Sequence, residues 1–129
     1  MSRVVGGGWH RTVELHEGEQ LLYEHAAIWW DGGWWGGSAT GKLYVTDQRC
    51  IWARDRLTLP IPRQSVLLIA VGDILDAEVY RRVLGVQTEE RKYWFKLFTF
   101  MLGWPDDKQD LEECRDMIEK AIRSNETPG

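Results

Sequence analysis

A single stretch near the C-terminal end of the chain has the spacing of an amphipathic helix. Between about Asp107 and Arg123, apolar residues recur on one helical face and charged residues on the other. The apolar face consists of Leu111, Cys114, Met117, Ile118, Ala121 and Ile122. Because no second helix is expected, this face has to be buried against a sheet. The chain is thereby constrained to a mainly β fold that one C-terminal helix closes.

The residues before the helix form short β-patterned segments that turn signals separate. Their β-branched, aromatic and alternating apolar residues predict seven antiparallel strands. These strands are expected at residues 20–30, 42–46, 49–53, 54–61, 65–71, 82–88 and 92–100. The segment 65–71 is apolar nearly throughout, so we expect it to be buried on both faces. Residues 72–81 are compatible with one short helical turn or with a loop, and we expect a loop.

The length of 129 residues and an apolar share of 43% indicate one globular domain with a core of its own. We expect a glycine-containing N-terminal segment at 1–14, the domain at 15–124 and a polar tail at 125–129. The longest apolar run, Val66 to Val71, is far shorter than the roughly 20 residues of a membrane-spanning helix. The N-terminus lacks the apolar region of a secretion signal. These features predict a cytoplasmic protein.

Catalytic and metal-binding patterns are missing from the sequence. Cys50 and Cys114 have neither C-x-x-C nor zinc-ligand spacing, and we expect two buried thiols. His10, His16 and His25 belong to no nucleophile motif. A net charge of −4 disfavours a nucleic-acid surface, which needs a cationic face. We therefore predict a non-enzymatic protein with no metal, no cofactor and no nucleic-acid partner.

Three segments resemble a known family. Residues 15–22 place a Gly-Glu pair before the first strand, and residues 59–66 form a proline-containing entry to a later strand. Residues 41–52 combine a small residue, an apolar-aromatic strand, Thr-Asp, a spacer, Arg, an apolar residue and the aromatic Trp52. Together they resemble the GRAM domains of the pleckstrin-homology-like class over about residues 15–123. The resemblance implies a seven-stranded antiparallel β-structure capped by a helix, and the hairpin pattern predicts a buried Trp52.

Basic residues are scarce where this resemblance would need them for lipid binding. Pleckstrin-homology modules that hold phosphoinositides place cations on the first strand, the first hairpin loop and the second strand. Here no Lys or Arg occurs between Arg11 and Lys42. The later cations Arg49, Arg54, Arg56 and Arg63 are expected to form a solvated rim. Alternatively, Arg54, Arg56 and Arg63 contact headgroups or an acidic partner.

Tryptophan is concentrated at the first predicted hairpin. Of eight tryptophans, four flank the Asp-Gly-Gly turn at 31–33: Trp29, Trp30, Trp34 and Trp35. Indoles supply large apolar area and an N–H donor, and they are favoured in interfaces and at membrane surfaces. Strand alternation leaves a second interpretation open, in which two of the four point inward and fill the mouth of the β-structure.

These observations favour a protein-interaction module that uses the Trp-rich hairpin. Its partner is another protein, and a second copy of the chain is one option. The alternative is a peripheral lipid-binding module, with the Trp tip in the membrane interface and Arg54, Arg56 and Arg63 near headgroups. Because attraction to anionic lipid is worth only about 1 kcal/mol per basic residue, an acidic chain gains little from it.

Replacement of Trp34 and Trp35 tests the exposed-anchor interpretation. The backbone of the 31–33 turn needs only glycine and polar residues, so Trp34→Ser with Trp35→Ser should change stability by no more than about 0.5 kcal/mol. Loss of two interface indoles should weaken association by at least about 2 kcal/mol. Thermal melts and light scattering or pull-down on the same double variant measure both quantities. A collapsed melt would show instead that these indoles belong to the core.

Overall fold

The computed structural model describes residues 3–7, 10–30, 39–54, 66–80, 83–97 and 108–126. These residues form nine strands, one short 3₁₀ helix and one α-helix. In chain order they are β1 Arg3–Gly7, β2 His10–Leu15, β3 Leu21–Trp30, β4 Ala39–Thr46, β5 Arg49–Arg54, β6 Val66–Ala70, η1 Val71–Asp73, β7 Ile74–Tyr80, β8 Val83–Thr88, β9 Lys92–Leu97 and α1 Lys108–Glu126. The predicted hairpin tip at 31–33 and most of the predicted strand at 54–61 lie outside the described residues.

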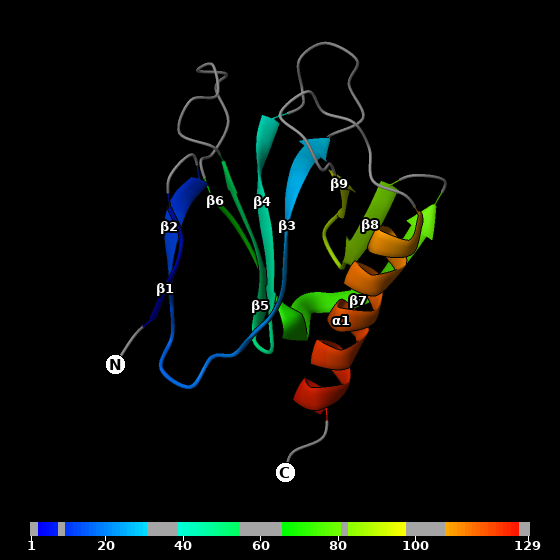
Figure 1. Cartoon of the computed structure of the whole chain (residues 1–129). Coiled ribbons are helices and arrows are strands. Elements are labelled where there is room, and N and C mark those ends of the chain that lie inside the picture. The colour runs from blue at the N-terminus through cyan, green and yellow to red at the C-terminus, as the bar shows by residue number, and fades with distance from the viewer. Residues whose placement is uncertain are drawn as a thin grey trace.

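Strands β3 to β9 form one antiparallel sheet in the order β6-β5-β4-β3-β9-β8-β7. β3 is the central strand: it pairs with β4 along most of its length and with β9 at its C-terminal end. Trp29 on β3 therefore lies opposite Ala39 on β4 and Phe95 on β9. The remaining strands, β1 and β2, form a separate hairpin, and α1 lies on the other side of the sheet (Figure 1). The predicted mainly β fold with a C-terminal helix is confirmed.

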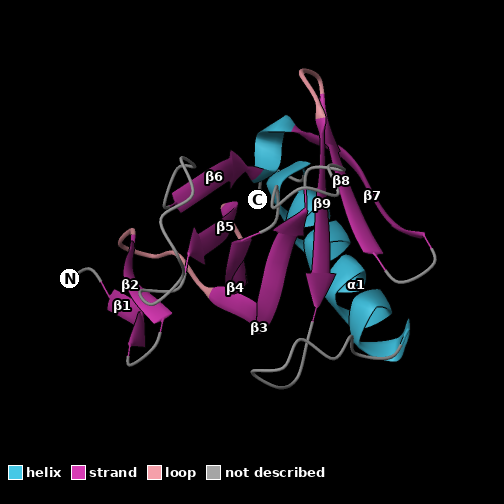
Figure 2. Ribbon diagram, turned by 90° about the horizontal axis from the view of Figure 1, so that it is seen from above, coloured by secondary structure: helices cyan, strands magenta, loops and turns pink. Residues whose placement is uncertain are grey.

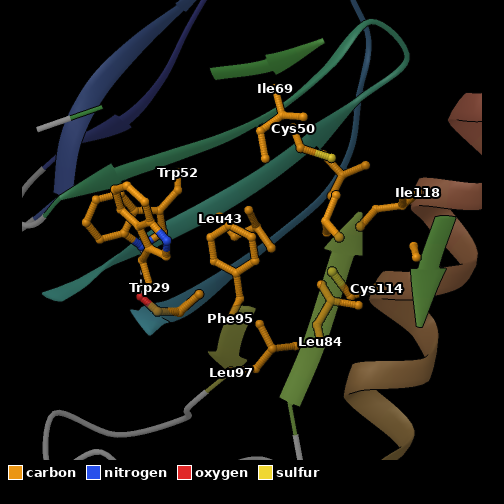
Figure 3. Packing of buried hydrophobic residues seen from close by; sticks show 14 of the residues in the cluster. Trp29, Leu43, Cys50, Trp52, Ile69, Leu84, Phe95, Leu97, Cys114 and Ile118 are labelled. Carbon is orange, nitrogen blue, oxygen red and sulfur yellow. Dashed lines mark hydrogen bonds between the residues drawn. The ribbon is translucent and has the colours of Figure 1, made fainter. Parts of the chain in front are cut away.

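The main core lies between the sheet and α1. Leu111, Cys114 and Ile118 of the helix are buried and join apolar side chains from the sheet, as Figure 3 shows for Cys114 and Ile118. Met117 and Ile122 are half-buried against the same cluster. The helix face predicted from the sequence is thus the face that packs.

Trp52 on β5 is fully buried within this core, as predicted. Its indole Nε1 donates a hydrogen bond of 3.2 Å to the backbone carbonyl of Ala27. Gly41 on β4 makes room for the ring, since a Cβ at this position would lie 2.8 Å from Cε2 of Trp52. The small residue at the start of the hairpin motif is therefore required by packing.

A second core lies on the opposite face of the sheet, beneath the β1–β2 hairpin. Val13 and Leu15 on β2 pack against Tyr44 on β4 and Ile51 on β5, all of them buried. The expectation of a segment outside the domain at 1–14 missed these strands. Glycines obscured the strand pattern of β1, and only the alternation of Val13 and Leu15 indicated a strand.

Two other predictions are wrong and involve consecutive elements. The apolar segment around β6 was expected to be buried on both faces, but its residues alternate between buried and exposed. Leu67 and Ile69 face the main core, whereas Val66 and Leu68 on the opposite face are exposed. Residues 72–81 were expected to form a loop, but they contain the last two residues of η1 and all of β7. β7 carries acidic residues on its exposed side, and these residues interrupt the apolar pattern.

The buried carboxylate of Glu19 joins three segments of the fold. It accepts hydrogen bonds from Arg49 Nε at 2.9 Å, from Thr46 Oγ1 at 2.6 Å and from the backbone N–H of His16 at 2.7 Å. Arg49 Nη2 also donates to the backbone carbonyl of Glu14 at 2.9 Å. The ion pair thereby fixes β2 and the turn after it to the β4–β5 turn. Glu19 belongs to the Gly-Glu pair of residues 15–22, and Arg49 is the Arg of the motif at residues 41–52. The ion pair therefore joins two of the segments on which the family resemblance rests.

Burial would raise the pKa of Glu19, but hydrogen bonds from Arg49, Thr46 and His16 outweigh it and lower this pKa from 4.5 to about 2. The ionised carboxylate therefore stabilises the fold above about pH 4.5. This contribution is lost as the pH falls toward 2.

Glu19→Gln should destabilise the protein by about 3 kcal/mol at pH 7, because it leaves the largely buried Arg49 without its charged partner. Urea denaturation at pH 7 and pH 3 measures this cost, which should shrink at the lower pH. The exposed Glu14→Gln is the matched control and should stay within about 0.5 kcal/mol of the parent at both pH values. An equal cost of Glu19→Gln at both pH values would contradict the assigned role of the ionised carboxylate.

Candidate binding site

Trp29 occupies the end of β3, where the sequence predicted a partner-binding indole. Its side chain is only 5% exposed and packs edge-on against Trp52, with ring centroids 5.3 Å apart (Figure 3). The ring centroid of Tyr93 on β9 lies 6.3 Å from that of Trp29. The expectation for Trp29 is therefore corrected: strand register turns this indole into the core, where it does not meet a partner directly.

The other three indoles of this region are placed only in part. Trp30 is the last residue of β3, and its backbone pairs with that of Trp94 on β9. The side chain of Trp30, and Trp34 and Trp35 as a whole, lie outside the described residues. Their role as partner contacts stays a prediction from sequence.

Two of the four arginines of the predicted rim, Arg49 and Arg54, lie within the described residues, and Arg49 is held by Glu19. Arg54 ends β5 and is 7% exposed, so it does not form a solvated rim. Arg56 and Arg63 lie outside the described residues.

The described cations near the first hairpin are engaged within the chain. Lys42 on β4 forms an ion pair of 3.0 Å with Glu24 on β3, and its ammonium lies 5.5 Å from the ring centroid of Tyr44. Arg49 is held by Glu19. Headgroup binding at this hairpin would have to compete with these internal partners.

A cleft of about 290 Å³ opens where β6 leads through η1 into β7. Figure 2 shows η1 between these two strands. The described residues that line the cleft are Leu68, Ile69, Gly72, Asp73, Leu75, Thr88, Glu89, Glu90 and Tyr93. Its walls combine exposed leucines with three carboxylates.

The sequence did not indicate this cleft, because each segment that lines it was interpreted separately. Leu68 was expected to be buried, and Leu75 was placed in a loop. Glu89 and Glu90 lie between the strands expected at 82–88 and 92–100, where the sequence indicated only a connection. The available signal was the acidic and apolar mixture of 72–81, which is compatible with an end strand whose outer side faces solvent.

Other chemistry is not indicated among the residues described. They contain no group of three or more His, Cys, Asp or Glu side chains arranged to hold a metal ion. Burial raises the pKa of the Cys50 thiol to about 12 and that of Cys114 well above 9.0. Within the same ranges, no helix is long and apolar enough to cross a membrane.

Comparison with known proteins adds a fold. No family model matches the chain, and no curated protein matches it in sequence. Among solved structures, the Vps36 N-terminal PH domain is 15% identical with a TM-score of 0.62, and the alignment covers 95% of this chain and 92% of that one. The N-terminal PH domain of human ARAP2 is 11% identical with a TM-score of 0.53, over 83% and 84%.

A third match is a structure of the linker-DH/PH domains of p115-RhoGEF, with 13% identity and a TM-score of 0.59 over 85% of this chain. The alignment covers 31% of that longer chain. The fold of this protein is thus that of the PH-like domains, which confirms the fold that the sequence predicted.

Trp29→Ala should destabilise the fold by about 3–5 kcal/mol, since it removes a large aromatic ring from between Trp52 and Tyr93. Chemical denaturation measures this cost. Leu68→Ala, at an exposed position, is the control and should change stability by no more than about 0.5 kcal/mol. If the Trp29→Ala variant is as stable as its parent, Trp29 is not a core residue and is again a candidate for partner binding.

Proposed function

We propose that this chain is a non-catalytic module that binds another protein. The observation that supports this most directly is the placement of exposed apolar side chains. Of the five large apolar residues exposed among those described, four lie on the two end strands: Val66 and Leu68 on β6, and Leu75 and Tyr80 on β7. Apolar side chains gathered at strand edges are typical of a surface that another chain covers.

The charges of the described residues favour a protein partner over a lipid headgroup. Lys42 and Arg49 are paired with Glu24 and Glu19, and Arg54 is buried. The net charge of −4 adds a general repulsion from anionic membranes. Trp34 and Trp35 stay a second predicted contact for the same kind of partner.

The ion pair between Glu19 and Arg49 supports a finer proposal about the family. Within the PH-like class, we place this chain with the GRAM domains. The Gly-Glu pair and the Arg of its hairpin stand far apart in the sequence, yet they meet in one buried interaction. A shared structural need for that pair would explain why both motifs occur together.

Two measurements separate protein binding from lipid binding. The chain should not co-sediment with phosphatidylcholine vesicles, or with vesicles that also contain phosphatidylserine and phosphoinositides. Affinity capture from a lysate treated with nuclease and detergent should retain a defined protein in stoichiometric amount. Co-sedimentation with the anionic vesicles alone, reversed by salt, would overturn the proposal in favour of a lipid-binding module.

A further inference from the structure

The β6–η1–β7 cleft combines three properties that together select a kind of partner: two exposed leucines, acidic charge and strands at the ends of the sheet. Leu68 and Leu75 are 56% and 67% exposed, although both line the cleft. Asp73, Glu89 and Glu90 supply its ionisable groups. The described lining residues include no Lys or Arg.

Arg91 stands near this cleft without reversing its charge. Its guanidinium lies 4.8 Å from the ring centroid of Tyr93, which lines the cleft. Against the positive charge of Arg91 stand the three carboxylates among the described lining residues. The local charge is therefore negative and attracts a basic group. Because Asp73, Glu89 and Glu90 are exposed, this attraction is screened by salt.

Two of the strands that line the cleft, β6 and β7, lie at the ends of the sheet. Among the described strands, β6 pairs only with β5, and β7 pairs only with β8. An end strand presents backbone donors and acceptors on its outer side, and an extended peptide can add to it as a further strand. The strands that carry Leu68 and Leu75 thus suit backbone recognition as well as side-chain contacts.

The cleft has a volume of about 290 Å³, at the lower end of the range of about 300–1,000 Å³ for ligand sites. A cleft of this size accommodates one or two side chains of a longer ligand. The exposed Leu68 and Leu75 would cover the apolar neighbours of such side chains.

From these observations we propose that the cleft binds an extended segment of a partner protein that carries a Lys or Arg beside apolar residues. The basic side chain enters the cleft among Asp73, Glu89 and Glu90. Its apolar neighbours cover Leu68 and Leu75, and its backbone adds to an end strand. The proposal rests on the proposed function and names the class of partner.

The probe is a phage-displayed library of random peptides of about ten residues, the upper length of an ordinary strand. Selection on the immobilised full chain should enrich sequences with a basic residue beside apolar ones. The leading peptide is then synthesised with a fluorophore, and its dissociation constant is measured by anisotropy. Binding should weaken as salt rises, because the pairing is ionic in part.

Two cleft variants, each with a matched control, locate the binding. Glu89→Lys with Glu90→Lys should weaken binding at least about tenfold, whereas Glu14→Lys with Glu113→Lys, which gives the same change in net charge at exposed positions elsewhere, should not. Leu68→Ser with Leu75→Ser should weaken it as much, whereas the exposed Val4→Ser on β1 should not. Two further peptides are N-methylated at every second amide, one at the odd and one at the even positions. Binding should be abolished in the one whose methylated amides would bond to the end strand, and kept in the other.

Each other result overturns the inference in a recognisable way. A selected peptide that binds all variants equally would show a protein-binding module whose site lies elsewhere, so the proposed function would stand without this cleft. Enrichment of acidic or purely apolar peptides, or of none, would contradict the class of partner. Loss of binding in both the cleft and the control charge variants would reveal a nonspecific charge effect. Vesicle co-sedimentation separately decides the proposed function.

Discussion

The β4–β5 hairpin is the element on which all other layers pack, because both of its faces are covered. Leu43 and Trp52 face the core beneath α1, whereas their neighbours Tyr44 and Ile51 face the β1–β2 hairpin. Consecutive strand residues point to opposite faces, so one register places two apolar sets correctly at once. A slip of one residue would exchange the two sets, and the buried Glu19–Arg49 pair at the adjoining turn opposes such a slip.

Elements with local signals could be predicted from the sequence, and elements whose burial depends on distant neighbours could not. The β4–β5 hairpin combines alternation with turn chemistry within a few residues, and α1 has a complete apolar face. β6 has apolar residues on both sides, but only the fold decides that it is an end strand with one side exposed. β7 has the opposite problem, since its exposed acidic residues conceal a strand that is inwardly apolar at Ile74 and Ala77.

The same distinction explains the outcome for the candidate site. Composition identified an unusual density of indoles, but register alone turns Trp29 toward Trp52 and Phe95. A cation predicted at the surface, Arg54, is buried for the same reason. The cleft draws its lining from β6, η1, β7, β9 and the ends of the β8–β9 turn. Because no segment contains more than a few of these residues, only the assembled fold brings the leucines and the carboxylates together.

The acidic groups of the cleft also bear on the choice between a foreign partner and a second copy. Sheets avoid edge-to-edge association by placing charges at their end strands. Two copies joined cleft to cleft would bring the Asp73, Glu89 and Glu90 sets together, and like charges at close range are repulsive. A basic segment reverses the sign of that interaction and leaves the apolar and backbone contacts in place. The carboxylates can thus repel a second copy of this chain while they attract a basic segment of another protein. Specificity then comes from repulsion as well as from attraction.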